Sequence, residues 1–86
     1  MKKIVFISAI WCPACLIMRP RYQTFCSNKN SFVLQELDFD DDASLIKQLN
    51  IGKTLPVAIV YDGSKELKRL SGEMSLKKIE EQLRAL

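Results

Sequence analysis

The 86-residue sequence contains no histidine, which limits the metal sites that it could form. Structural zinc sites are normally built from four cysteine or histidine ligands. Cysteine occurs only at Cys12, Cys15 and Cys26, so too few ligands are present for such a site. We therefore expect no metal. A non-enzymatic module that binds a metal or a partner through the same cysteines is kept as an alternative of another functional class.

Long apolar runs and long basic runs are also missing. No segment approaches the roughly 18 apolar residues of a membrane span, so we expect no membrane insertion. The net charge is only +3, and the basic residues are neither clustered nor interleaved with aromatic side chains, so we expect no nucleic-acid partner. The apolar stretch that begins at Ile4 ends after about seven residues with no small-residue cleavage site, unlike a secretory signal.

Glycine and proline are scarce, with three of each, and no repeat, linker or low-complexity segment divides the chain. A hydrophobic content of 48 per cent is enough to build a core in a chain of this size. We expect a single domain over residues 1–86 that acts as a monomer. An odd number of cysteines without an export signal favours redox-active thiols in the cytoplasm over a structural disulfide framework.

The stretch Trp11–Cys15, which reads WCPAC, places two thiols one helical turn apart directly after an apolar run. That run, Ile4–Ile7, is typical of a strand buried on both faces. Pro13 suits the first position of a helix, where an amide would be unpaired anyway and where its fixed φ is already helical. The spacing therefore predicts Cys12 at the N-cap of a helix and Cys15 one turn inside it, where the two sulfurs can meet.

An N-cap position changes the chemistry of a thiol. The free amides and the positive end of the helix favour the thiolate over the thiol. The stabilisation is about 0.3 to 2 kcal/mol, which lowers the pKa enough to raise the thiolate fraction at neutral pH from about 3 per cent towards tens of per cent. Because the thiolate is the attacking species in thiol-disulfide exchange, Cys12 is the candidate nucleophile.

The rest of the chain predicts three more strands and two more helices. Apolar residues recur at helical spacing after the cysteines, and Ser75 offers a cap for a last helix. Asp40 to Asp42 offer a solvated helix start with carboxylates in its first turn, and Asp62-Gly63 is a strong hairpin signal. The order is βαβαββα, an α/β pattern, with strands at 4–7, 32–38, 56–61 and 65–70 and helices at 13–27, from about 40 to 50, and at 76–86.

These features together resemble the thioredoxin superfamily, reduced to its glutaredoxin-sized core. The resemblance rests on Trp11–Cys15 after the first strand, Pro20 five residues past the second cysteine, Thr54-Leu55-Pro56 before the third strand and Gly72 after the fourth. It implies a minimal thioredoxin fold, with a four-stranded mixed sheet flanked by three helices. It also implies a protein-disulfide reductase that uses a Cys12/Cys15 dithiol, with Cys12 attacking the substrate and Cys15 releasing it.

The resemblance further implies how substrates bind. Pro56 is expected to be a cis proline that faces the cysteines and turns the backbone of Leu55 outward, so that a substrate strand can pair there. Trp11 and Pro13 lie beside Cys12 in the motif; Trp11 either shields the rim of the site or contacts substrates. Gly72 is expected to form a positive-φ turn between strand and helix, with a substrate contact also possible.

Two departures from the family pattern bear on the mechanism. Phe6 stands where thioredoxins usually have a buried aspartate, and Glu36 stands near the usual place of a basic partner, so the proton acceptor for Cys15 is not identified. The residues of Ser71–Ser75 lack the Gly-Gly-x-Asp-Asp stretch with which glutaredoxins bind glutathione. The expected electron donor is therefore a flavin-dependent, thioredoxin-reductase-like enzyme, with no cofactor bound by this chain. A glutathione-dependent glutaredoxin is the alternative.

Cys26 is expected to stay outside this chemistry. It lies eleven residues past Cys15 in the same predicted helix, a distance of about 16 Å at 1.5 Å per residue, too far for a disulfide. We expect it to be a buried cysteine of the core.

Overall fold

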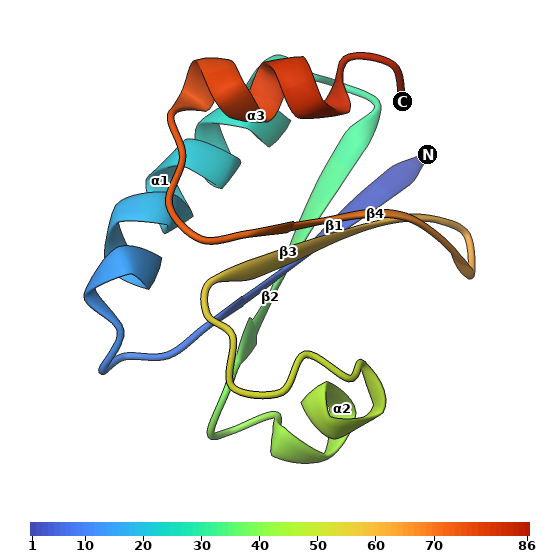
Figure 1. The fold of residues 1–86 in the computed structure, drawn as a ribbon. Coiled ribbons are helices and arrows are strands. Elements are labelled where there is room, and N and C mark those ends of the chain that lie inside the picture. Colours follow the sequence, from blue (N-terminus) through green and yellow to red (C-terminus); the bar gives the residue numbers. More distant parts are fainter.

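The structure is a computed structural model that describes all residues from 1 to 86, and it contains the predicted order of strands and helices (Figure 1). The first strand is longer than predicted at both ends, and the second and third helices are shorter. The elements are β1 (Lys2–Ser8), α1 (Pro13–Asn28), β2 (Phe32–Asp38), α2 (Ala43–Gln48), β3 (Val57–Asp62), β4 (Lys65–Ser71) and α3 (Leu76–Leu83).

The four strands form one mixed sheet in the order β2-β1-β3-β4. β1 pairs with β2 in parallel and with β3 antiparallel, and β3 and β4 form an antiparallel hairpin. The crossover between the two parallel strands is α1, as a parallel pair requires a long connection. These observations confirm the predicted α/β fold with its four-stranded mixed sheet and three helices.

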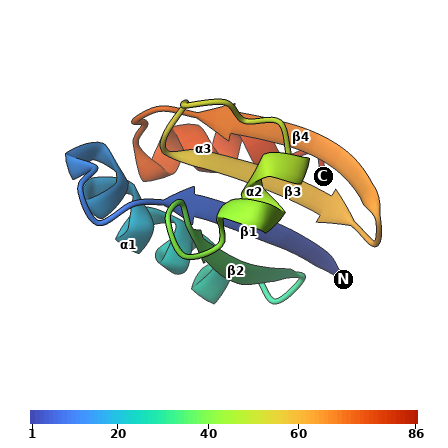
Figure 2. The ribbon, with the colours of Figure 1, turned by 90° about the horizontal axis from the view of Figure 1, so that it is seen from below.

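Helices cover both faces of this sheet. α1 and α3 lie on one face and α2 lies on the other (Figures 1 and 2). Side chains of β1 alternate between the two faces: Ile4 and Phe6 join the core under α1 and α3, and Val5 and Ile7 join the core on the α2 side. β1 is therefore buried on both faces, as its continuous apolar run predicts, and this rigid central strand leads directly into the cysteine motif.

The hairpin of β3 and β4 also follows the sequence signals. Gly63 has φ +64° in the turn, a conformation that glycine adopts without steric cost. β4 is an edge strand of the sheet, and its charged residues suit that exposed position. None of the helices has the length and apolar character needed to cross a membrane.

The acidic stretch before α2 differs from expectation. Asp42 occupies the N-cap of α2, but its carboxylate makes no capping bond and accepts instead from the amide of Asp38 at 2.8 Å. The carboxylate of Asp38 accepts from the amides of Asp40 and Asp41 at 2.9 and 3.0 Å. No acidic residue lies in the first turn of α2, so the prediction of first-turn carboxylates is wrong. The aspartates stabilise the tight turn after β2 instead.

Candidate active site

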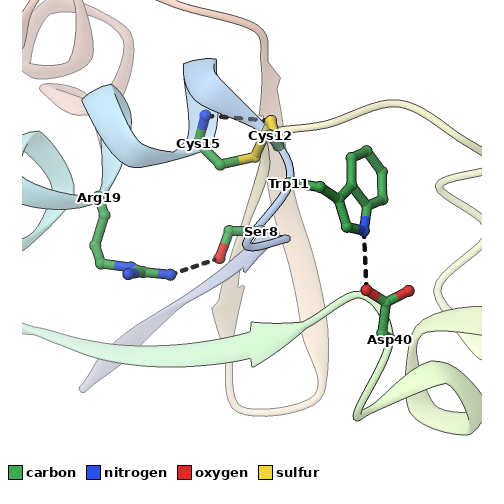
Figure 3. The surroundings of a disulfide bond; sticks show 6 residues. All are labelled: Ser8, Trp11, Cys12, Cys15, Arg19 and Asp40. Atoms are coloured by element: carbon green, nitrogen blue, oxygen red, sulfur yellow. Dashed lines mark hydrogen bonds between the residues drawn. A yellow bond between two sulfur atoms is a disulfide. The ribbon is translucent and has the colours of Figure 1, made fainter.

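The cysteine pair lies where β1 passes into α1. Pro13 is the first residue of α1 and Cys12 is its N-cap, with extended dihedrals of φ −108° and ψ 104°. A disulfide joins Cys12 and Cys15, whose Cα atoms are 5.3 Å apart (Figure 3). The sulfur of Cys12 also accepts a hydrogen bond from the amide of Cys15 at 3.2 Å. The predicted N-cap sulfur is therefore present, with a helix amide pointing at it.

The two sulfurs differ in accessibility. Cys12 retains 8 per cent of its surface, whereas Cys15 is fully buried. Both pack against Ala9 at the end of β1, and Leu55 completes the contact from the opposite loop. Cys12 is therefore the cysteine of the pair that keeps some access to solvent.

Trp11 lies at the rim of this site and is 59 per cent exposed. Its indole Nε1 donates a hydrogen bond to the carboxylate of Asp40 at 2.9 Å (Figure 3). Its ring meets Phe39 edge to face, with ring centroids 5.8 Å apart. The indole is thus held in a fixed place beside Cys12 while most of its surface stays open. Asp40 is a site residue that the sequence analysis assigned only to a solvated helix start.

Leu55 and Pro56 form the opposite wall of the site. The peptide bond between them is cis, as the family resemblance implied. Pro56 is buried, whereas Leu55 is partly exposed and packs against the cysteines. Neither the amide nor the carbonyl of Leu55 has a hydrogen-bond partner within the chain, so both groups are free to pair with another strand.

Gly72 connects the end of β4 to this wall. Its φ of +83° confirms the expected positive-φ turn, which leads from β4 toward α3. Its amide donates a hydrogen bond to the carbonyl of Pro56 at 3.0 Å. Pro13 lies exposed beside Cys12. The fold thus brings Gly72 into contact with Pro56. It also places Trp11 and Leu55 near the cysteine pair.

The sequence analysis missed a buried polar group at the end of β1, the strand that leads into the cysteine motif. Ser8, the last residue of β1, is 2 per cent exposed. Its hydroxyl accepts a hydrogen bond from Nη2 of Arg19 on α1 at 3.1 Å (Figure 3). Nε of Arg19 lies 2.9 Å from a carboxylate oxygen of Glu36 on β2. Spacing alone could have signalled that Arg19 shares a helix face with Cys15, four residues earlier.

The structure shows where the two residues that depart from the family pattern, Phe6 and Glu36, are placed. Phe6, at the position of the usual aspartate, is fully buried and packs against Tyr22 with ring centroids 5.1 Å apart. Burial raises the pKa of the Tyr22 hydroxyl, so this group stays neutral. Glu36 is occupied by Arg19 and by the side-chain amide of Gln23. Glu36 is the register partner of Phe6 on β2, and its carboxylate is paired with these two side chains and not hydrogen-bonded to either cysteine.

Cys26 is free and lies apart from the site, although it is less buried than expected. It is partly exposed and packs against the core under α1 and α3 from the side. Burial raises the pKa of its thiol to about 11, which makes it a poor nucleophile at neutral pH. No group of three or more cysteine, aspartate or glutamate side chains is placed to hold a metal ion.

Comparisons with known proteins agree with this geometry. A sequence model of the family described as Thioredoxin matches residues 2–85. Thioredoxin of Gallus gallus is 28 per cent identical over 83 residues, which cover 96 per cent of this chain and 77 per cent of the relative.

Solved structures show the same fold. Oxidised mitochondrial thioredoxin 3 of Saccharomyces cerevisiae superposes with a TM-score of 0.86 at 16 per cent identity, over 99 per cent of this chain and 78 per cent of its own. Thioredoxin of Fasciola hepatica superposes with a TM-score of 0.87 at 19 per cent identity, over 98 and 79 per cent of the two chains.

Proposed function

The chain belongs to the thioredoxin family and is a thiol-disulfide oxidoreductase, and from that premise we propose that it reduces disulfides in protein substrates with Cys12 as nucleophile and Cys15 as resolving thiol. The observation that carries this assignment is the N-cap sulfur of Cys12, which accepts the amide of Cys15 and is disulfide-bonded to it. The family match does not favour the glutaredoxin alternative.

The proposed reaction has two exchange steps. The thiolate of Cys12 attacks one sulfur of the substrate disulfide, and the other substrate sulfur leaves as a thiolate. Cys15 then attacks the sulfur of Cys12 in the mixed disulfide, which forms the Cys12–Cys15 bond and releases the second substrate thiolate. Two electrons pass to the substrate, and the two protons lost by the cysteine pair end on the substrate thiols. The oxidised pair seen here is the product state.

We propose that the substrate pairs with the backbone of Leu55. The free amide and carbonyl of this residue support the proposal, because an added strand would satisfy both. Leu55 also packs against the cysteines, so a strand paired there would place its disulfide near Cys12. Pro56 and Gly72 hold this segment in place through the hydrogen bond between them.

Apolar side chains around the motif support a role in contacting the substrate. Ile10, Trp11, Leu16 and Ile17 are all exposed, by 44 to 79 per cent, within five residues of one of the cysteines. Exposed apolar side chains that gather in one region of a surface are typical of a binding site. We assign Trp11 and Pro13 to this surface, with Trp11 held in place by Asp40.

The proposed electron donor is a flavin-dependent, thioredoxin-reductase-like enzyme, and the proposed location is the cytoplasm, where the chain acts as a monomer. Family membership supports a reductase partner in general. The free thiol of Cys26, which lies apart from the redox-active pair, supports a reducing compartment, because free thiols persist there.

An insulin turbidity assay tests the proposed function, with Cys26→Ala as the matched control that leaves the pair intact. Cys12→Ser should abolish activity, and Cys15→Ser should accumulate mixed disulfides that a reductant releases. Activity that survives in Cys12→Ser would overturn the assignment of the nucleophile. Turnover of a glutathione mixed disulfide with glutathione as donor would instead support the glutaredoxin alternative.

A further inference from the structure

Ser8 stands out in the interior of this protein. All other buried residues are apolar residues or cysteines, and the only other buried hydroxyl group is that of Tyr22. Burying a hydroxyl costs free energy unless it is hydrogen-bonded, so a buried serine directly after the apolar run Ile4–Ile7 needs a reason. Ser8 is followed directly by Ala9, which packs against both cysteines. The buried hydroxyl therefore belongs to the residue that precedes this contact with the redox pair.

Arg19 supplies the partner of this hydroxyl. It lies four residues after Cys15 on α1, so the two side chains are neighbours on one face of the helix, with about 5 to 6 Å between their Cβ atoms. Nη2 of Arg19 donates to the oxygen of Ser8 and so occupies one of its acceptor sites. The proton of the hydroxyl is left free to be donated. In Figure 3 this hydroxyl points toward the guanidinium of Arg19.

Glu36 holds the other end of the guanidinium. An oxygen of its carboxylate lies 2.9 Å from Nε of Arg19 and forms an ion pair with it. This contact does not have the geometry of a hydrogen bond, so Nε is left without a hydrogen-bond partner. The side chain of Glu36 is 39 per cent exposed, so water weakens its field. The guanidinium thus has its Nη2 toward Ser8 and its Nε toward the carboxylate on β2.

The other charged groups near the pair are already engaged. Asp38, which is the register partner of Ser8 on β2, accepts the amides of Asp40 and Asp41. The carboxylate of Asp40 accepts the indole of Trp11. Arg19 is therefore the cation that both contacts the buried hydroxyl and shares a helix face with Cys15.

We propose that Arg19, aligned by Ser8 and Glu36, is a positioning residue that favours the thiolate of Cys15 in the second exchange step. This inference rests on the proposed roles of Cys12 and Cys15. The positive charge and the free proton of Ser8 stabilise the developing negative charge on the resolving sulfur, which has no carboxylate base beside it. The proton of Cys15 passes through solvent to the leaving substrate thiolate, so no further reactant is needed.

The test is a stopped-flow reaction of the reduced full chain with dithiobis(nitrobenzoate), in a Cys26→Ala background that removes the third thiol. Attack by Cys12 releases one coloured thiolate, and resolution by Cys15 releases a second. The pH dependence of the second phase reports the ionisation of Cys15. The first phase is an internal control, because a protein that lacks it fails the proposed function itself and not this inference.

Arg19→Met should slow the second phase about fivefold at pH 7 and move its midpoint to higher pH, because a neighbouring positive charge favours ionisation of the thiol and the 35 per cent exposure of the Arg19 side chain weakens that effect. Arg19→Lys should restore most of the rate because it keeps the charge. Ser8→Ala should slow the second phase by about threefold, with the first phase unchanged, because one neutral hydrogen-bond donor is lost.

Glu36→Gln is the decisive variant, because it lies on the surface and removes the competing negative charge. It should speed the second phase and move its midpoint to lower pH, opposite to Arg19→Met. If Arg19, Ser8 and Glu36 have a purely structural role, Arg19→Met and Glu36→Gln should change the rate of the second phase in the same direction. That result would overturn the proposal. A second phase within twofold of the parent in both variants also overturns it.

Discussion

Reduction of the disulfide adds two thiols to the free thiol of Cys26, and we predict that iodoacetamide at pH 7 modifies Cys12 far faster than Cys26. Cys12 lies at the N-cap with the amide of Cys15 pointing at its sulfur. Cys26 lies near the other end of α1 with no such partner. The two thiols of one helix therefore provide a comparison within a single molecule.

The size of the difference follows from their ionisation. Burial raises the pKa of Cys26 to about 11, so about one molecule in ten thousand carries its thiolate at pH 7. An ordinary thiol is about 3 per cent ionised at this pH, and a helix-terminus stabilisation of about 1.4 kcal/mol raises the ratio of thiolate to thiol about tenfold for Cys12. The thiolate populations then differ by about 2,000-fold.

Intrinsic nucleophilicity reduces this ratio. A thiolate of lower pKa is a weaker nucleophile, with a Brønsted coefficient of about 0.4 to 0.5. The correction lowers the expected rate ratio of Cys12 to Cys26 to roughly fiftyfold. Cys15, which is fully buried, should react last.

Mass spectrometry of the cysteine peptides at successive times measures the three rates, with Cys12→Ser and Cys26→Ala as controls for peptide assignment. The rate at Cys12 should rise with pH along a curve centred below that of a small-molecule thiol measured in parallel. If the two curves coincide, or if Cys12 reacts less than tenfold faster than Cys26, the argument from the helix terminus is wrong.

Three further predictions concern stability. Phe6→Ala should lower the free energy of unfolding by about 3 to 5 kcal/mol in urea denaturation of the oxidised protein, because it opens a cavity against Tyr22 in the buried core. Ser75→Ala should cost about 1 kcal/mol in the same assay, because the hydroxyl caps α3 by accepting the amide of Lys78, and an unchanged midpoint would contradict that role. The raised pKa of Cys26 stabilises the fold below about pH 9, and this contribution should be lost between pH 9 and 11, where the thiol ionises in the unfolded chain but not yet in the folded one. Cys26→Ala should remove that part of the pH dependence of the free energy of unfolding. Parallel curves of stability against pH for the two proteins would refute it.

The fold was largely predictable because local signals agreed with the final packing. Ile4–Ile7 is apolar at every position, and the structure buries it on both faces of the sheet. Asp62-Gly63 marked the hairpin, and Pro13 marked the start of α1. The acidic residues before α2 were misassigned because carboxylates bind turn amides as readily as helix amides, and the sequence does not distinguish the two.

The cysteine pair of the site was also predictable, since its spacing is local. The contacts of Ser8 with Arg19 and of Arg19 with Glu36 were not, because they depend on how α1 packs across β1 and β2. The bond from Trp11 to Asp40 likewise joins residues 29 positions apart. Cys26 was expected to be more buried, but its position at the side of the core leaves it partly exposed.

The unpaired main chain at Leu55 has a consequence for turnover. One residue offers a single donor and a single acceptor. Two such bonds contribute about 1 to 3 kcal/mol, less than the roughly 4 kcal/mol of a millimolar complex. These main-chain bonds alone are therefore too weak to retain a client, so its retention at this strand depends on the covalent link to sulfur and on the apolar surface around Trp11.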